Sequence, residues 1–275
     1  MNFSHKLKWS VKRRVLALIE MLPWGQDLYR RYWIYPRAND SFRGVFADMD
    51  SAIDSIGTNR NSGYDRNNQR KSLEHELGVV DSYFQDSDYP ALFWLSRAMN
   101  AQGTVLELGG SVGYSYFGFR RFFEYPDGLR WTIVELPGAV RLGLKIAAQR
   151  HETALTFVES VARDFKASIY LTSGTLQYMP ETLSSLLGQL DYLPDHVIVN
   201  RVPVTPDDSF WTIQNVGVNE LPYKVSNREQ FVQSVTELGY EMVDSWRTGR
   251  QLVVPFSNKQ DADEYCGFYF RRPDI

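Results

Sequence analysis

The stretch Thr104-Val105-Leu106-Glu107-Leu108-Gly109-Gly110-Ser111-Val112-Gly113 decides the fold of this 275-residue chain. A short apolar run with one acidic residue, Glu107, ends in a turn that contains three glycines, and a helix-like segment over 114–124 follows at once. Because glycine has no Cβ, backbone N–H groups at such a turn can approach a ligand at the start of a helix. The stretch therefore predicts the first strand, loop and helix of an α/β unit that binds a nucleotide or a nucleoside.

Strand-like and helix-like runs alternate after this loop. We expect helices over 114–124, 139–150, 181–190 and 227–238, and strands over 104–109, 130–136, 155–159, 168–173, 196–202, 240–247 and 265–271. This alternation is typical of a doubly wound, mostly parallel sheet with helices on both faces. The last two strands are expected to form an antiparallel hairpin at the sheet edge. The sequence therefore predicts an α/β fold with a seven-stranded, Rossmann-like sheet.

The residues before this sheet predict a helical N-terminal extension. Residues 11–22 place apolar side chains on one helical face, and residues 24–56 are expected to continue as aromatic-rich helical pieces. Residues 57–70 are almost entirely polar and predict a loop, in which Tyr64 and Asp65 are candidates for a lid. A helix from Tyr89 then leads into the glycine strand. We divide the chain into a helical cap with its polar loop, 1–79, and a cofactor-binding domain, 80–275.

The overall composition is that of an ordinary globular protein. The chain is 43% hydrophobic and 23% charged, which excludes an intrinsically disordered protein. Its single cysteine, Cys266, lies in a strand-like run, which excludes an intrachain disulfide and predicts a buried thiol. No apolar run approaches the length that spans a bilayer, and no signal-peptide cleavage pattern follows residues 15–22. We therefore expect a cytoplasmic protein, with no nucleic-acid partner.

The N-terminal residues differ in charge from the rest of the chain. Residues 1–37 contain eight basic and two acidic residues, a balance of +6, although the whole chain carries −3. Such a segment fits weak contact with an anionic membrane at its inner face, or a solvated appendage. Both interpretations stay open at this stage, and the oligomeric state is not predicted.

Two chemistries that the glycine loop allows are disfavoured by the surrounding sequence. A dinucleotide site requires G-x-G-x-x-G, but from Gly109 the third and sixth positions are Ser111 and Tyr114. A serine hydrolase would use Gly109-Gly110-Ser111-Val112-Gly113 as its nucleophile elbow, with Asp191 or Asp195 and then His196 as partners. However, several strands should precede such an elbow, and His196 begins a strand. The hydrolase stays as a third candidate.

The interpretation that fits the spacing best is a site for S-adenosylmethionine. Glu135 ends the second strand, where an acidic group can accept hydrogen bonds from both ribose hydroxyls. Glu107 can face the ammonium group of the cofactor, and helix N–H groups near Gly113 and Tyr114 can face its carboxylate.

The chain resembles the class I methyltransferases, and more narrowly the methyltransferase family found among bacterial surface-polysaccharide genes. The resemblance extends from about Phe42 to about Trp246. It rests on Tyr89-Pro90-x-x-Phe93-Trp94-Leu95, Leu106 to Gly113, Trp131-x-x-Val134-Glu135, Leu176-Gln177-Tyr178, Asn200-Arg201-Val202-Pro203, Thr212-Ile213-Gln214-Asn215, Pro222-Tyr223 and Gly239-Tyr240. One position departs from the class pattern, because the central glycine of its loop is Ser111 here.

The resemblance implies a Rossmann-like methyltransferase fold and S-adenosyl-L-methionine as cofactor. It implies O- or N-methylation of a small molecule or of a sugar or glycan precursor, with surface-polysaccharide biosynthesis as the setting. A cofactor-binding protein without transferase activity is the alternative, given Ser111 and the lack of an obvious base. The residues expected to bind the cofactor are Glu107, Gly109, Gly110, Gly113, Tyr114, Glu135, Glu159, Gln177 and Tyr178.

Within this set, the carboxyl ends of the later strands supply the groups around the adenine and the methyl group. Glu159 could meet the adenine amino group, and Gln177 and Tyr178 would flank the sulfonium, since an aromatic face favours a cation. The polar groups expected nearest the methyl acceptor are Asn200, Arg201 and Gln214, although no catalytic base is identified. No His and Cys pattern has metal-ligand spacing, so we predict no catalytic metal.

Overall fold

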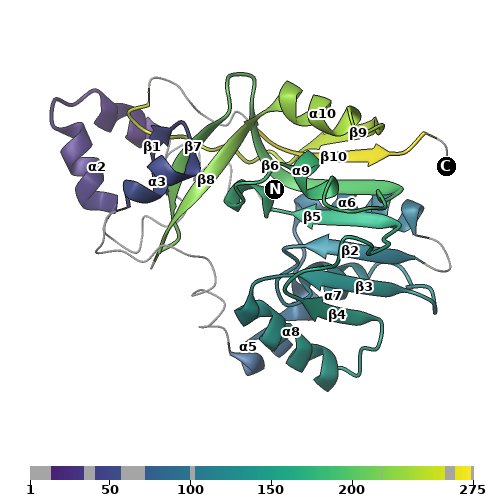
Figure 1. The fold of residues 1–275 in the computed structure, drawn as a ribbon. Helices are drawn as coiled ribbons and strands as arrows, with labels where there is room; N and C mark the ends of the chain where they lie inside the picture. The colour runs from purple at the N-terminus through teal and green to yellow at the C-terminus, as the bar shows by residue number, and fades with distance from the viewer. Residues whose placement is uncertain are drawn as a thin grey trace. The chain divides into compact units, whose positions relative to one another are not determined.

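The computed structural model of the protein describes residues 14–33, 41–56, 72–99, 103–217, 219–257 and 264–273 (Figure 1). It consists of two compact units that alternate along the chain. Unit 1 comprises residues 1–64, 203–228 and 249–265, and unit 2 comprises residues 65–202, 229–248 and 266–275. The expected boundary between residues 79 and 80 falls inside unit 2. The division into a cap and a domain at that point stays a prediction.

Unit 2 contains the predicted sheet. Its strands are β2 (Thr104–Leu108), β3 (Arg130–Val134), β4 (Leu155–Val158), β5 (Ile169–Ser173), β6 (His196–Thr205), β9 (Glu241–Arg247) and β10 (Glu264–Arg271). Their order is β4-β3-β2-β5-β6-β10-β9. The pairs from β4 to β6 are all parallel, and β9 pairs with β10 in the antiparallel sense. This is the expected Rossmann-like α/β fold, with the reversal of strand order beside β2.

The helices of unit 2 begin where the sequence supplies caps. They are α5 (Leu73–Val79), α6 (Tyr89–Ala98), α7 (Tyr114–Phe119), α8 (Pro137–Gln149), α9 (Leu183–Leu187) and α10 (Arg228–Thr236), with short 3₁₀ turns η2 (Val80–Ser82), η3 (Asp86–Asp88) and η4 (Leu176–Tyr178). Ser72 and Thr182 accept backbone N–H groups at the starts of α5 and α9, and Pro137 occupies the first turn of α8. Each predicted helix of the α/β region is therefore present, although α7 and α9 are shorter than expected.

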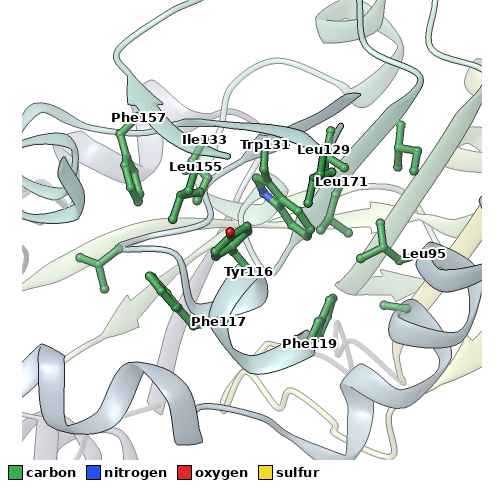
Figure 2. Packing of buried hydrophobic residues seen from close by; sticks show 14 of the residues in the cluster. Leu95, Tyr116, Phe117, Phe119, Leu129, Trp131, Ile133, Leu155, Phe157 and Leu171 are labelled. Atoms are coloured by element: carbon green, nitrogen blue, oxygen red, sulfur yellow. The ribbon is translucent and has the colours of Figure 1, made fainter. Parts of the chain in front are cut away.

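The core of unit 2 lies between the sheet and its helices (Figure 2). Trp131 and Ile133 of β3 are completely buried, and Tyr116 of α7 meets the Trp131 indole edge to face at 5.5 Å. Phe117 from the same helix lies with Leu155 and Phe157 in this cluster. Burial of a large aromatic side chain stabilises a fold by about 2–3 kcal/mol, so α7 and the loop before it are held firmly against β3.

Unit 1 contains strands that the sequence analysis did not predict. Its sheet order is β1 (Ser41–Phe46), β7 (Phe210–Asn215), β8 (Glu220–Asn227) and the last residues of β6. Residues 24–56 were expected to be helical, and this is wrong for β1, because its backbone pairs with β7. The helical pieces that do form are residues 14–20, α2 (Gly25–Trp33) and α3 (Met49–Asp54).

The β7–β8 hairpin could have been recognised from the sequence. The first strand, β7, is rich in aromatic and β-branched residues, and Gly217 in the connection has a φ of 87°, a conformation that favours glycine. The Asn215 side chain accepts the Gly217 N–H at 2.7 Å, as turn asparagines do. A turn glycine after a β-prone run was the available signal, and β8 itself has few residues with β propensity.

Cys266 lies in β10 and is buried, as predicted. No helix of the described segments has both the length and the apolar character needed to cross a bilayer.

Candidate functional site

The carboxyl ends of the parallel strands in unit 2 meet at one edge of the sheet, where open α/β sheets bind their ligands. The register places Leu108 beside Val134 and Thr172, and Ser173 beside Asn200. The loops after these residues therefore start at about the same level. Strand ends and loops at this edge hold Glu107, Gly109, Gly110, Gly113, Tyr114, Glu135, Glu159, Gln177, Tyr178, Asn200 and Arg201.

The glycine loop has a backbone that other residues would not tolerate. Gly109 has a φ of 74°, and a Cβ there would lie 2.0 Å from Oγ1 of Thr175. Gly113, with a φ of 101°, is in the left-handed region just before α7. Ser111 also has a positive φ, 54°, so the residue that replaces the class glycine keeps a conformation that glycine adopts easily. The loop is thus bent as the sequence predicted, with serine at one strained position.

Glu107 lies beneath this loop and is almost completely buried. One carboxyl oxygen accepts the indole N–H of Trp131 at 2.8 Å, and a Cβ on Gly110 would lie only 2.6 Å from the carboxyl carbon. Burial raises the pKa of Glu107 to about 7, against hydrogen bonds from Ser115 and Trp131 that lower it. A positive charge close by would hold this carboxyl ionised.

Two neighbouring charges act on Glu107 in opposite directions. The negative charge of Glu135 raises its pKa further, and the positive charge of Arg201 lowers it. Glu107, Glu135 and Arg201 therefore form one electrostatic cluster, although Glu107 lies in β2, Glu135 follows β3 and Arg201 lies in β6.

Glu135 is held in place by the glycine loop. Its backbone N–H bonds to Val158 at the end of β4, which continues the sheet register by one residue. One carboxylate oxygen accepts the Ser111 N–H at 3.1 Å, and the other accepts the Leu136 N–H at 2.7 Å. Backbone donors of this kind fix the orientation of a carboxylate. A carboxylate at the end of the second strand is therefore presented beside the loop, where the sequence analysis placed the ribose.

The remaining predicted cofactor residues differ in exposure. Glu159 is exposed after β4, and Tyr178 is half-buried in η4. Gln177 is buried, and its Oε1 has no hydrogen-bond partner among the described residues. A buried acceptor without a donor is costly, so this oxygen is a candidate to accept a hydrogen bond from a ligand.

Tyr114 adds a contact that the sequence did not reveal. Its hydroxyl donates to Glu76 of α5 at 2.5 Å, and the Tyr83 ring stacks on its ring at 4.1 Å. Glu76 itself is buried. The segment just after the polar loop is thereby joined to the first residue of α7, next to Gly113. Glu76 lies 38 positions before Tyr114 in the sequence, so no local pattern links the two.

Asn200 lies at the centre of a second network. Its amide nitrogen donates to Asp88 at 2.9 Å, and its amide oxygen accepts the indole N–H of Trp246 at 3.0 Å. Gly267 faces Trp246 across β9 and β10, and a Cβ on Gly267 would lie 2.1 Å from the indole ring. Both ends of the amide are therefore engaged within the protein. A role of Asn200 in holding an acceptor stays a prediction.

Arg201 has a backbone conformation that is unusual for its residue type. Its φ is 59°, its Nε donates to Ser173 at 3.0 Å, and Asp88 lies 3.9 Å from the same nitrogen. A non-glycine residue in the left-handed region costs roughly 1 kcal/mol or more, and such strain gathers at functional sites. Arg201 and Gln177 both approach Gly174, at 3.6 and 3.7 Å from the position of a Cβ there.

Gln214 belongs to unit 1 and not to this edge of unit 2. It is buried in β7, between Phe42 of β1 and Leu221 of β8. Its expected place near the acceptor stays a prediction. Tyr64 and Asp65, the candidates for a lid, lie outside the described residues.

The structure contradicts a serine-hydrolase site in which Ser111 is the nucleophile and His196 is its base. His196 pairs through Ile169 with Val105, at the start of β2, whereas Ser111 follows the end of that strand. The two are separated by two strand spacings, roughly 10 Å, and by at least three residues along the strand, roughly another 10 Å. His196 instead bonds to the Tyr269 hydroxyl at 2.8 Å. Ser111 therefore has no triad partner in His196.

Within the described segments, no group of three His, Cys, Asp or Glu side chains could hold a metal ion.

Comparison with known proteins finds similarity in three-dimensional structure but not in sequence. No family model and no curated protein matches the chain. Among solved structures, the methyltransferase CcbJ of Streptomyces caelestis is 14% identical, with 72% of this chain and 96% of that chain covered and a TM-score of 0.46. The 1,6-didemethyltoxoflavin-N1-methyltransferase of Burkholderia thailandensis is 17% identical, with coverages of 74% and 91% and a TM-score of 0.47.

The magnesium protoporphyrin IX methyltransferase of Synechocystis PCC 6803, with bound SAM, is 14% identical, with coverages of 82% and 92% and a TM-score of 0.46. Similarity at this level assigns no function to the chain.

Proposed function

We propose that the chain is an S-adenosyl-L-methionine-dependent methyltransferase. Its acceptor is a small molecule or a sugar or glycan precursor that is methylated at oxygen or nitrogen, and its setting is surface-polysaccharide biosynthesis in the cytoplasm, at the inner face of the membrane. The observation that carries the proposal is the Glu135 carboxylate, which backbone N–H groups hold beside the glycine loop.

The residues present fit an adenosyl cofactor with an amino-acid end. Glu135 offers a fixed pair of acceptor oxygens to vicinal ribose hydroxyls, and Gly109 and Gly113 allow the positive φ angles with which the loop turns into α7. Glu107 gains from a neighbouring cation, because burial, the largest influence on it, raises its pKa to about 7. The site contains no pattern for a pyrophosphate, which a dinucleotide would require.

The cofactor supplies a methyl group already activated on a sulfonium. The chain then has to position the acceptor and exclude water, which can account for most of the catalysis in such a displacement. Gln177 supports this arrangement, because its buried, unpartnered Oε1 would accept a hydrogen bond from an acceptor hydroxyl or amine. Arg201, fixed by Ser173, would orient the same acceptor.

The alternative is a protein that binds the cofactor without transferring its methyl group. Ser111 favours this alternative, since it occupies a strained position in the loop, and so does the engagement of Asn200 within the protein. Both candidate functions require the same cofactor, so cofactor binding is tested first and turnover second.

Isothermal titration calorimetry of the full chain with S-adenosylmethionine and with S-adenosylhomocysteine tests the proposal. We expect micromolar binding that weakens by about 10- to 100-fold in Glu135→Ala, because hydrogen bonds to a charged group contribute about 1.5–3 kcal/mol. Glu241→Ala, which removes an exposed carboxylate from β9, is the matched control and should bind as the parent does. Absence of binding to either compound would contradict both candidate functions.

A further inference from the structure

Residues 15–28 of unit 1 present an apolar surface that the described part of the protein leaves exposed. Single exposed apolar residues are normal on soluble proteins, but contiguous ones mark an interaction surface. Here Met21 is 82% exposed, Leu18 64% and Trp24 58%. We call the following residues the N-terminal apolar surface: Val15, Leu18, Met21, Leu22, Trp24 and Leu28, all of which are exposed.

Other side chains of the same segment attach it to unit 1, so the exposure does not come from a detached helix. Leu16 packs against the cluster that contains Trp211 and Ile213. The Tyr29 hydroxyl donates to the Phe42 carbonyl at 2.8 Å, and Glu20 accepts the Phe256 N–H at 2.8 Å. One set of side chains therefore packs against the rest of unit 1, and the N-terminal apolar surface faces solvent.

A tight turn joins the two helical pieces that carry this surface. Residues 14–20 are helical, α2 begins at Gly25, and the Gly25 N–H bonds to the Leu22 carbonyl at 2.9 Å. A Cβ on Gly25 would lie 1.8 Å from the Ile19 carbonyl oxygen, so only glycine allows this approach. The turn itself carries Met21 and Trp24, two of the most exposed residues of the surface.

The charge around the surface indicates what binds it. Residues 1–37 contain eight basic and two acidic residues, and Arg14 and Arg31 are exposed within the described part of this range. Of the two acidic residues, Glu20 bonds to the backbone of unit 1. Exposed Leu, Met and Trp side chains in a stretch of sequence rich in Lys and Arg are the pattern of a segment that lies in the interface of an anionic bilayer.

We propose that the N-terminal apolar surface inserts into the headgroup region of a membrane containing anionic lipids, with Arg14 and Arg31 against the lipid phosphates. The proposal rests on the membrane location proposed above and assigns the membrane contact to named residues. It does not depend on methyl transfer, because lipid binding is measured without cofactor or acceptor.

Flotation of the full chain with vesicles tests the proposal. We expect binding to phosphatidylcholine vesicles that contain phosphatidylglycerol, little binding to phosphatidylcholine alone, and weaker binding as salt rises from about 0.1 to about 0.5 M. The triple variant Leu18→Ser/Met21→Ser/Trp24→Ser should bind at least about a hundredfold more weakly, since each lost apolar group weakens partition by about tenfold. The double variant Arg14→Glu/Arg31→Glu lowers the charge of residues 1–37 from +6 to +2 and should weaken the preference for anionic vesicles.

The matched control is Phe93→Ser/Leu144→Ser, which removes two exposed apolar side chains from unit 2. It should bind vesicles as the parent does. Circular dichroism and thermal unfolding should match for all variants, because every altered side chain is exposed. Equal vesicle binding by the triple variant and the control would overturn the proposal. A parent that is dimeric in light scattering, and becomes monomeric with the triple variant, would also overturn it, because a second copy would then cover the surface.

Discussion

The buried carboxyl of Glu107 should make the stability of the protein depend on pH in a direction opposite to that of most acidic residues. A glutamate ordinarily ionises near 4.5, whereas burial raises the pKa of Glu107 to about 7 in the folded protein. Between these values the folded state binds more protons than the unfolded state. The free energy of unfolding should therefore fall as the pH rises from about 4.5 to about 7, and then become constant.

The substitution Glu107→Gln removes this dependence without changing the shape of the side chain. The amide cannot ionise, and its oxygen can still accept the Trp131 indole N–H that the carboxylate accepts at 2.8 Å. The interval from 4.5 to about 7, at 1.36 kcal/mol per pH unit, limits the effect to the order of 3 kcal/mol. We expect the variant to match the parent near pH 5 and to exceed its stability by up to that amount at pH 8.

Urea unfolding of both proteins at pH 5, 6, 7 and 8 measures this difference. The contributions of other groups cancel in it, including that of His196, whose pKa is lowered by burial. Glu159→Gln makes the same chemical change at an exposed position and should leave the stability unchanged at each pH. A nuclear magnetic resonance titration of the Trp131 indole N–H, assigned with Trp131→Phe, should have its midpoint near pH 7. A midpoint near 4.5, or a stability difference that does not vary with pH, would refute the reasoning.

Three further substitutions test the loop and its supports. Gly110→Ala should destabilise the protein by about 1–3 kcal/mol in urea unfolding, because its Cβ would lie 2.6 Å from the Glu107 carboxyl carbon. The control Gly78→Ala should be neutral or stabilising, because no atom lies within 4 Å of the position of its Cβ. Ser111→Ala should keep the parent's affinity for S-adenosylhomocysteine in calorimetry, since alanine keeps the backbone N–H that donates to Glu135. An esterase activity that vanishes with this variant would restore the hydrolase. Gly267→Ala should displace the Trp246 indole, seen as a shifted indole resonance, and an unchanged resonance would show that the ring does not lie over that glycine.

The glycine loop and the carboxylate of Glu135 were predictable because both depend on local features of the chain. A strand that ends in glycines and leads into a helix specifies its own turn, and an acidic residue that ends the next parallel strand must reach the same edge of the sheet. No packing detail was needed for these predictions.

The environment of Glu107 was not predictable in the same way. Its acidic character in a buried strand indicated a function, but its pKa depends on Trp131 of the neighbouring strand and on exclusion of water by the loop. The network around Asn200 joins residues 112 and 46 positions away, and no periodicity connects such distant positions. The strand β1 was mistaken for a helix because its partner, β7, follows more than 160 residues later.

The sequence by itself determined where the glycine loop and the acidic strand end lie, since glycine torsions and strand ends are set by neighbours along the chain. Only the tertiary structure decided how the charges of Glu107, Glu135 and Arg201 act on one another. It also decided that the Asn200 amide is hydrogen-bonded within the protein, and that Leu18, Met21 and Trp24 face solvent. The physical reason is that burial and electrostatic interaction depend on distances between residues far apart in sequence. These distances exist only once the strands have paired and the helices have packed.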